Sequence, residues 1–261
     1  MRRADGQVVV QSLLWRPPQI AERGPKRSLT PQQIAATTVR IADADGLESV
    51  SMQRVAADLG VTKMALYRYV PGKAGLLAIA VEEAVGAAPE GSALPPGWRP
   101  GLQAWARLLR SVWLAHPWLP GATVGDRSMG PRELAWTECP LGVLAPTGLQ
   151  AAERLDVVLV LSGHVRNTTV ADAAGSQPWA VSGAVGSALH HELHDHGDAF
   201  PNLLANLAEI SPHERLPDSG WELGLRLLLD GLQAKVNMLN PTPDGSGSDR
   251  RPARPTPALD L

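Results

Sequence analysis

Residues 51–70 read SMQRVAADLGVTKMALYRYV, which is two short helical patterns joined by a glycine. The apolar residues of the first pattern share one face of a helix by their i, i+3, i+4, i+7 spacing: Met52, Val55, Ala56 and Leu59. Ser51 stands before this face as an N-cap, and Gly60 ends it because glycine adopts a positive φ without steric cost. The stretch therefore predicts two helices around a tight turn.

The second pattern has a buried side and an exposed side. Thr62 can cap this helix, and the residues expected to be buried are Ala65, Leu66 and Val70. The exposed side combines two cations, a phenol and a thioether: Lys63, Met64, Tyr67 and Arg68. Such a pair of helices is typical of a helix-turn-helix, whose second helix enters the major groove of double-stranded DNA. Helical proteins that never contact DNA also contain such pairs, so the pattern alone leaves both readings open.

The flanking sequence extends the pair to a helical head. Thr30 and Gln33 form a capping box that starts a helix before the pair, and Gly46 ends that helix. A Pro-Gly turn then opens a fourth helix over residues 74–85. Lys73 stands at its start, where a phosphate can also meet free backbone N–H groups.

Charge is distributed unevenly along the 261 residues. Residues 1–75 carry 11 Lys and Arg against 6 Asp and Glu, whereas residues 76–261 carry 13 against 20. A basic head on an acidic body is expected of a protein whose head alone binds nucleic acid. The single cysteine, Cys139, excludes an intramolecular disulfide and suits a reducing cytoplasm, and no apolar run is long enough to span a membrane.

The remainder of the chain also reads as helix, so the expected fold class is all-α. The longest helical patterns cover residues 98–116, 148–174, 179–196 and 221–238, with short helical pieces over residues 131–146. The sequence predicts four parts: a flexible N-terminal arm over 1–28, the helix-turn-helix domain over 29–75, a larger helical body over 76–239 and a disordered tail over 240–261. Lys26 and Arg27 of the arm could reach a phosphate or the minor groove.

The head resembles the DNA-binding domain of the TetR (tetracycline-repressor) family of bacterial regulators. The resemblance runs from Gly24 through LTPQQIAATTVRIADADGLESVSMQRVAADLGVTKMALYRYVPGKAGLL, and its most specific part is LYRYVPGKAGLL over residues 66–77. The body resembles the ligand-binding domain of the same family more loosely, in WRPGLQAWARLLRSVWLAHPWL and WELGLRLLLDGL. The resemblance implies a homodimer that carries one recognition helix on each subunit.

The resemblance also implies which residues contact DNA. Gln53 and Arg54 match positions at the start of the second helix that face DNA, and Tyr69 and Lys73 match phosphate-contacting positions. Tyr69 departs from the histidine that many members carry there, although its hydroxyl can still donate to phosphate. The variable positions that would set the operator sequence are Thr62, Lys63 and Met64, and Tyr67 follows them on the recognition helix.

An effector pocket in the body is implied by the family alone. The long helix over 148–174 carries three polar residues on one face, and tryptophans elsewhere could supply apolar walls. The resulting set of expected pocket residues is Trp105, Trp113, Trp136, His164, Asn167, Thr168 and Trp179. For any single one of them, an ordinary core residue is the more natural interpretation.

The sequence gives little support to a metal site or to an enzyme active site. The histidines of residues 190–196 have one pair at i, i+4, but a solvated helix end accounts for them better than a metal site, so no metal or cofactor is expected. The chain lacks GxGxxG, GxxxxGK[ST], GxSxG and CxxC motifs, so no enzymatic activity is expected.

The sequence thus predicts a cytoplasmic, nucleoid-associated bacterial regulator. We expect a repressor that binds a palindromic operator as a homodimer and is released by a small-molecule effector of unknown identity. The alternative is a helical small-molecule-binding protein without DNA binding.

Overall fold

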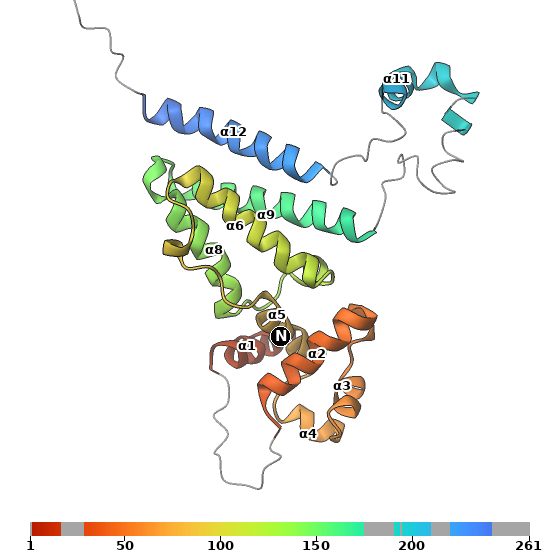
Figure 1. The fold of residues 1–261 in the computed structure, drawn as a ribbon. Coiled ribbons are helices and arrows are strands. Elements are labelled where there is room, and N and C mark those ends of the chain that lie inside the picture. The colour runs from red at the N-terminus through yellow and green to blue at the C-terminus, as the bar shows by residue number, and fades with distance from the viewer. Residues whose placement is uncertain (1, 17–28, 175–190, 194, 210–219, 242–261) are drawn as a thin grey trace, which may run out of the picture.

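A computed structural model describes residues 2–16, 29–174, 191–193, 195–209 and 220–241 of the chain. These residues form helices joined by turns, and none of them forms a strand (Figure 1). The predicted all-α fold class is therefore confirmed. No helix within this described part combines the length and the apolarity that crossing a bilayer requires.

The head consists of α2 (Pro31–Asp45), η1 (Leu47–Ser49), α3 (Met52–Asp58) and α4 (Lys63–Tyr67), followed by α5 (Lys73–Val85). The predicted capping box is present, because the Gln33 amide N–H donates to Thr30 Oγ1 at 3.1 Å and the Thr30 amide N–H donates to Gln33 Oε1 at 3.0 Å. Ser51 and Thr62 cap α3 and α4 as predicted. Their side chains accept from the backbone N–H groups of Arg54 and Ala65.

Gly60 closes α3 with two backbone hydrogen bonds. The Gly60 N–H donates to Ala57 O and the Val61 N–H donates to Ala56 O, both at 3.0 Å. This 6→1 and 5→2 pair is a Schellman motif, and it places Gly60 at φ +67°, where a side chain would be strained. The turn sets the angle at which α4 leaves α3.

The head has an apolar core into which α4 packs its buried side chain. The fully buried side chains there include Ile34, Ile41, Val50, Val55 and Leu66. Of the three residues expected to be buried on the second helix of the pair, Leu66 and Val70 are buried and Ala65 is only partly so. α4 ends at Tyr67, three residues before the end of the predicted stretch.

The expectation of an arm without helical period over residues 1–28 is wrong for its first half. Arg2–Trp15 forms a helix, α1, which packs against α5 and buries Val10 and Leu13. Its apolar residues do not follow a clean helical period, so docking rather than amphipathicity stabilises it. The indole N–H of Trp15 and the side-chain amide of Gln11 both donate to Met129 O. Lys26 and Arg27 lie outside the described residues.

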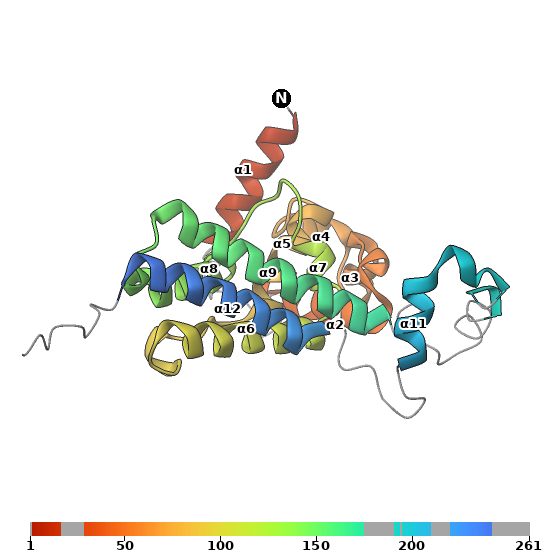
Figure 2. The ribbon, with the colours of Figure 1, turned by 90° about the horizontal axis from the view of Figure 1, so that it is seen from above.

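The body is a bundle whose principal helices are α6 (Trp98–Ala115), α8 (Pro131–Leu144), α9 (Ala151–Ala174) and α12 (Trp221–Leu239). α6 packs on α8 and α9, and α12 lies along α9 on the outer side of the bundle (Figures 1 and 2). Shorter pieces complete it: η2 (Gly91–Ala93), α7 (Leu119–Ala122) and η3 (Ala145–Thr147). η4 (Gly197–Ala199) and α11 (Pro201–Glu209) lie apart from this bundle in both views.

The head and the body share α5 and a hydrogen-bonded contact. The expected boundary between residues 75 and 76 falls inside α5, which packs on α2 of the head and on α8 of the body. Asp43 of α2 accepts from the indole N–H of Trp118 at 2.6 Å, and its Oδ1 lies 2.8 Å from His116 Nδ1. The residues that follow α6 are thereby hydrogen-bonded to α2. Most of the predicted helix over 179–196 and nearly all of the predicted tail lie outside the described residues.

Candidate DNA-binding surface and effector cavity

The exposed side of α4 carries the side chains that the sequence predicts. Lys63, Met64, Tyr67 and Arg68 are all exposed, with Met64 at 74% of its full accessibility, whereas Leu66 between them is completely buried. The Lys63 ammonium lies 5.8 Å from the centre of the Tyr67 ring, so these two side chains share one patch. We call Thr62, Lys63, Met64, Tyr67 and Arg68 the α4 strip.

The other residues predicted to contact DNA differ in their exposure and in whether they already form an ion pair. Gln53 and Lys73 are exposed, and Tyr69 is partly buried against the core. Arg54 is exposed but already paired: its Nη2 lies 2.7 Å from Asp45 Oδ2, and its Nε lies 4.0 Å from Asp58 Oδ1. A phosphate contact by Arg54 would therefore compete with two carboxylates of the head.

Three cations near α4 have no such competitor. Within the described residues, Lys63, Arg68 and Lys73 make no ion pair with any carboxylate. Lys73 is the first residue of α5, whose opening N–H groups carry the positive end of the helix dipole. These three charges are therefore available to an external anion.

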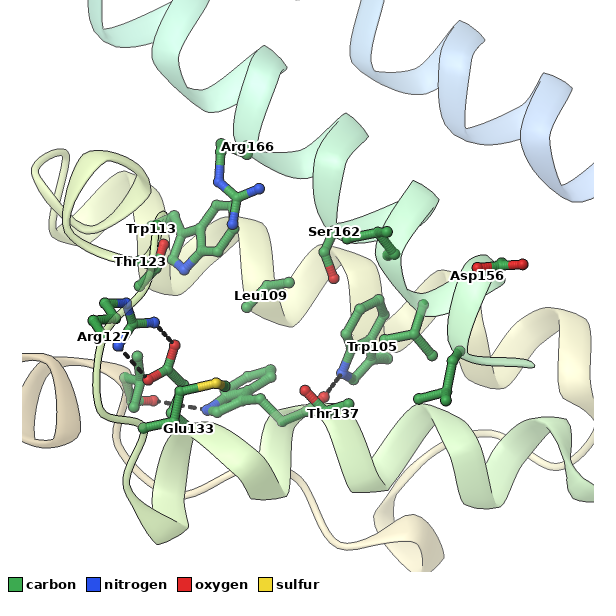
Figure 3. Close-up of a pocket in the computed structure, with 17 residues that line it drawn as sticks. Trp105, Leu109, Trp113, Thr123, Arg127, Glu133, Thr137, Asp156, Ser162 and Arg166 are labelled. Carbon is green, nitrogen blue, oxygen red and sulfur yellow. Dashed lines mark hydrogen bonds and ion pairs between the residues drawn. The ribbon is translucent and has the colours of Figure 1, made fainter. Parts of the chain in front are cut away.

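The body contains a cavity of about 430 Å³ between α6, α8, α9 and the loop before α8 (Figure 3). This volume lies within the range of about 300–1,000 Å³ that is usual for ligand sites. Three predicted pocket residues line it, namely Trp105, Trp113 and Trp136, and the partly apolar remainder of the wall includes Leu109, Met129 and Leu159.

Two of the wall tryptophans are held by hydrogen bonds to backbone carbonyls. The indole N–H of Trp136 donates to Val85 O at the end of α5, and the indole N–H of Trp105 donates to Trp136 O, both at 3.0 Å. Pro140 lies inside α8 and has no N–H to donate to Trp136 O. Trp105 supplies the missing donor, which explains why α8 is continuous where the sequence suggests only short helical pieces.

This arrangement predicts a coupling between Trp105 and Pro140. Trp105→Phe leaves the buried Trp136 carbonyl without a donor and should lower the free energy of unfolding by about 1–3 kcal/mol beyond the packing loss. In a Pro140→Ala background the residue 140 N–H can donate instead, so the cost of Trp105→Phe should fall. Urea unfolding of the four proteins measures this difference. Equal costs in both backgrounds would contradict the explanation.

The cavity also holds charged groups that no sequence pattern indicates. Arg127 Nη1 donates to Glu133 Oε2 at 2.8 Å, and a second contact joins Arg127 Nη2 to Glu133 Oε1. Arg166 of α9 lies with its guanidinium carbon 5.2 Å from the Trp113 ring centre. Figure 3 shows the two arginines and Glu133 at one end of the cavity and Asp156 at the other. Only the tertiary fold brings these residues together, and no local spacing signals them.

The predicted polar pocket residues on α9 do not line this cavity. His164 faces α12 instead: its Nε2 lies 2.9 Å from Trp221 O, and its ring stacks on the Trp221 indole at 5.2 Å. A Cβ at Gly224 would lie 2.3 Å from the His164 ring, so that contact requires glycine. Thr168 is buried and donates to His164 O at 2.8 Å, and Asn167 is exposed. Trp179 lies outside the described residues.

The histidine cluster and the cysteine offer little chemistry where the structure describes them. His191 and His196 are exposed beside Asp195 and Glu192, while His190 and His194 lie outside the described residues. Burial raises the pKa of the Cys139 thiol, so the unreactive protonated form is favoured.

Comparison with known proteins connects this head and body. Residues 34–79, which span α2 to α5, match bacterial regulatory proteins of the tetR family. Residues 92–236 match the tetracyclin repressor-like C-terminal domain, which covers more than half of the chain. The chain belongs to the tetR family. It is thus a regulatory protein of the helix-turn-helix type, as the sequence predicts.

Relatives within the tetR family extend the comparison. The chain is 38% identical over 154 residues to the HTH-type transcriptional repressor DrrR1 of Streptomyces coeruleorubidus, a match that spans 59% of this chain and 57% of DrrR1. It is 28% identical to an HTH-type transcriptional regulator of Saccharopolyspora erythraea, over 69% of this chain and 76% of that protein. The structure of ActR from Streptomyces coelicolor in complex with actinorhodin has a TM-score of 0.64 at 27% identity, over 80% of this chain and 98% of ActR.

Proposed function

We propose that this tetR-family protein is a ligand-responsive transcriptional repressor. It binds a palindromic operator as a homodimer, and a small molecule in the body cavity releases it. The observation that carries the proposal is the α4 strip, because it exposes Lys63, Met64 and Tyr67 while Leu66 anchors the same helix in the core. The relative DrrR1, named a transcriptional repressor, supports the direction of regulation.

The chemistry of the strip suits a duplex. A lysine such as Lys63 favours the guanine O6 and N7 acceptors, and an apolar side chain such as Met64 favours a thymine methyl group. Lys73, at the start of α5, suits a phosphate and carries no sequence information. Base reading and backbone anchoring are thus assigned to different residues.

A second copy of the chain accounts for exposed apolar residues on α9 and α12. Val160, Val170, Leu223, Leu227 and Met238 are each about half exposed or more. Gly163 and Gly231 lie on the same exposed sides, and a Cβ at either would meet nothing within 4 Å. A glycine inside a helix lowers stability by about 0.5–1 kcal/mol relative to alanine. Close packing of a partner helix against the bare backbone would compensate for this loss. We call these seven residues the α9–α12 face.

Release by an effector needs a link from the cavity to the head. Thr123, Gly125, Arg127 and Met129 line the cavity and follow directly after α7. The residues just before α7, His116 and Trp118, contact Asp43 of α2. An effector that prefers a conformation with the heads wrongly spaced for successive major grooves would release the DNA. That ActR was solved with actinorhodin supports a small-molecule effector.

Substitution of the two lysines separates base reading from anchoring. Lys73→Ala should weaken binding to every duplex and reduce the slope of log K against log salt by about one. Lys63→Ala should instead cost about 1–3 kcal/mol at one base pair of each half-site and relax the preference there. Fluorescence anisotropy over a salt series measures both effects, with an operator selected from a random duplex library and a scrambled duplex of the same length.

The matched control is Arg107→Ala, which removes an exposed cation of α6 that pairs with Glu222 of α12 and lies outside the head, and should leave both affinities unchanged. Equal losses for Lys63→Ala on operator and scrambled DNA would contradict its base-reading role. Undiminished duplex binding by a Lys63→Ala, Lys73→Ala double variant would contradict the proposed surface altogether. Failure of the wild-type protein to bind any duplex saturably would instead favour a small-molecule-binding protein without DNA binding.

A further inference from the structure

At one end of the cavity, the positive and negative charges of the lining side chains do not cancel. Arg127 and Glu133 neutralise one another through the paired contacts described above. Arg166 makes no hydrogen bond and no ion pair with any residue that the structure describes, although Arg127 and Glu133 are near enough to affect its pKa. The cavity therefore contains one cation more than its own carboxylate at this end can satisfy.

The environment of Arg166 makes this imbalance costly. Its Nε is shielded from solvent and unpartnered, and its guanidinium lies over the Trp113 ring. Burial lowers the pKa of Arg166, the positive charge of Arg127 lowers it further, and Glu133 opposes both. An arginine keeps its proton in proteins, so the cost appears as unfavourable free energy that an external anion can relieve.

A second arginine of the same bundle has the carboxylate partner that Arg166 lacks. Arg110 also lies over a tryptophan, with its guanidinium carbon 5.1 Å from the Trp221 ring centre, but its Nη2 contacts Asp172 Oδ2 at 2.6 Å. Arg166 has the aromatic neighbour without the carboxylate. Its place beside the cavity makes the bound molecule the natural source of the missing anion.

The rest of the cavity favours a flat aromatic skeleton. Three indole rings line it, and two of them are fixed in place by hydrogen bonds: Trp105 donates to Trp136 O, and Trp136 donates to Val85 O. Fixed aromatic walls favour stacked or edge-on contacts with another ring system. Aliphatic chains would gain burial there but no such contact.

We propose that the effector is a planar aromatic acid, whose carboxylate or phenolate pairs with Arg166 while its rings lie among Trp105, Trp113 and Trp136. The inference rests on the proposed role of this cavity as the effector site and adds the chemical class of its ligand. A cationic amine is disfavoured at this end, because Glu133 is already engaged by Arg127 and an amine would meet the unpaired charge of Arg166. The other carboxylate that lines the cavity, Asp156, lies at the opposite end, away from Arg166 (Figure 3).

Two matched probes test the proposal: anthraquinone-2-carboxylate and its neutral isostere anthraquinone-2-carboxamide. Isothermal titration calorimetry of the full-length protein, without DNA, measures their dissociation constants. We expect the acid to bind about 10- to 100-fold more tightly than the amide, the worth of a charge-assisted hydrogen-bonded pair. Arg166→Gln should remove most of this preference and change the affinity for the amide less than threefold.

The control variant is Arg107→Gln. Arg107 is an exposed arginine of α6 that pairs with Glu222 of α12 and does not line the cavity, so this change should preserve the preference for the acid. Equal affinities of the wild-type protein for the two probes, or tighter binding of the amide, would overturn the assignment without any variant. Absence of binding by both probes at millimolar concentration would also overturn it. If Arg166→Gln does not fold, as judged by circular dichroism, Arg166→Lys serves instead and should weaken binding of the acid severalfold.

Release of a bound duplex is scored separately by anisotropy. If the acid binds as predicted but leaves the duplex bound, the ligand class stands and the proposed release mechanism fails. If the protein binds no duplex at all, the calorimetric preference still decides the ligand class on its own.

Discussion

Leu227→Asp is expected to convert the proposed homodimer into a monomer and to lower operator affinity by a factor on the order of 10²–10⁴. Leu227 lies on the α9–α12 face and is 61% exposed in the single chain. In a two-fold interface both copies of the substituted residue would be buried together, so two carboxylates would lose solvation. The large effect on DNA follows because two linked heads bind two half-sites as one unit, whereas two monomers bind them separately.

Sedimentation equilibrium measures the mass of the variant, and anisotropy measures its affinity for the operator and for one isolated half-site. Leu108→Asp is the matched control, since Leu108 is an exposed leucine on α6 outside the α9–α12 face. It should keep the dimer and the full affinity. A Leu227→Asp protein that remained a dimer would place the interface elsewhere on the molecule.

Leu66→Ala should lower the stability of the head, whereas Met64→Ala should change only its base preference, although the two residues lie two positions apart on α4. Leu66 is fully buried in the core that includes Ile34, Val50 and Val55, so its truncation should destabilise the head by about 2–5 kcal/mol. Met64 is largely exposed, so Met64→Ala should change stability by no more than about 0.5 kcal/mol. On DNA, the first change should weaken binding to all sequences and the second should alter preference at one base pair.

Native-state hydrogen exchange of the peptide over residues 52–67 reports the free energy of opening the head directly. Exchange in Met64→Ala should match the wild-type protein, and exchange in Leu66→Ala should approach that of the unfolded chain. A Met64→Ala protein with the same preference at every base pair would assign Met64 a role other than base contact.

The head could be predicted from the sequence because its signals are local. Ser51, Thr62 and the Thr30 capping box each act within three or four residues, and Gly60 determines a turn by its own φ. The alternation of buried and exposed residues on α4 follows from helix period alone. The ion pair of Arg54 with Asp45 cannot be predicted from helix period, since Asp45 approaches Arg54 only once α2 and α3 have packed.

The cavity could be predicted only in part, because its residues come from distant segments. The bulky tryptophans 105, 113 and 136 suggested walls by size, but the charged set of Arg127, Glu133 and Arg166 has no shared spacing. His164 illustrates the opposite error. A polar residue on an apolar helix suggested a pocket, whereas it packs against α12, where Gly224 leaves room for its ring.

Long-range hydrogen bonds explain the two errors in helix prediction. The proline at position 140 suggested a break, yet α8 continues because Trp105, 31 residues away from Trp136, donates to the carbonyl that the proline leaves without its usual donor. The N-terminal helix α1 is held by Met129 O, more than 100 residues distant. Neither partner can be recognised from the local sequence.

The central claim is that the α4 strip reads a duplex as one half of a symmetric pair. Selection of bound sites from a random duplex library by the full-length protein tests it most directly. We predict enrichment of an inverted repeat whose half-sites lie about one helical turn apart or somewhat more, with the preferred bases changed symmetrically in both half-sites by Met64→Ala. Recovery of no sequence above the random background, or of a site that Met64→Ala and Lys63→Ala leave unchanged, would contradict the account.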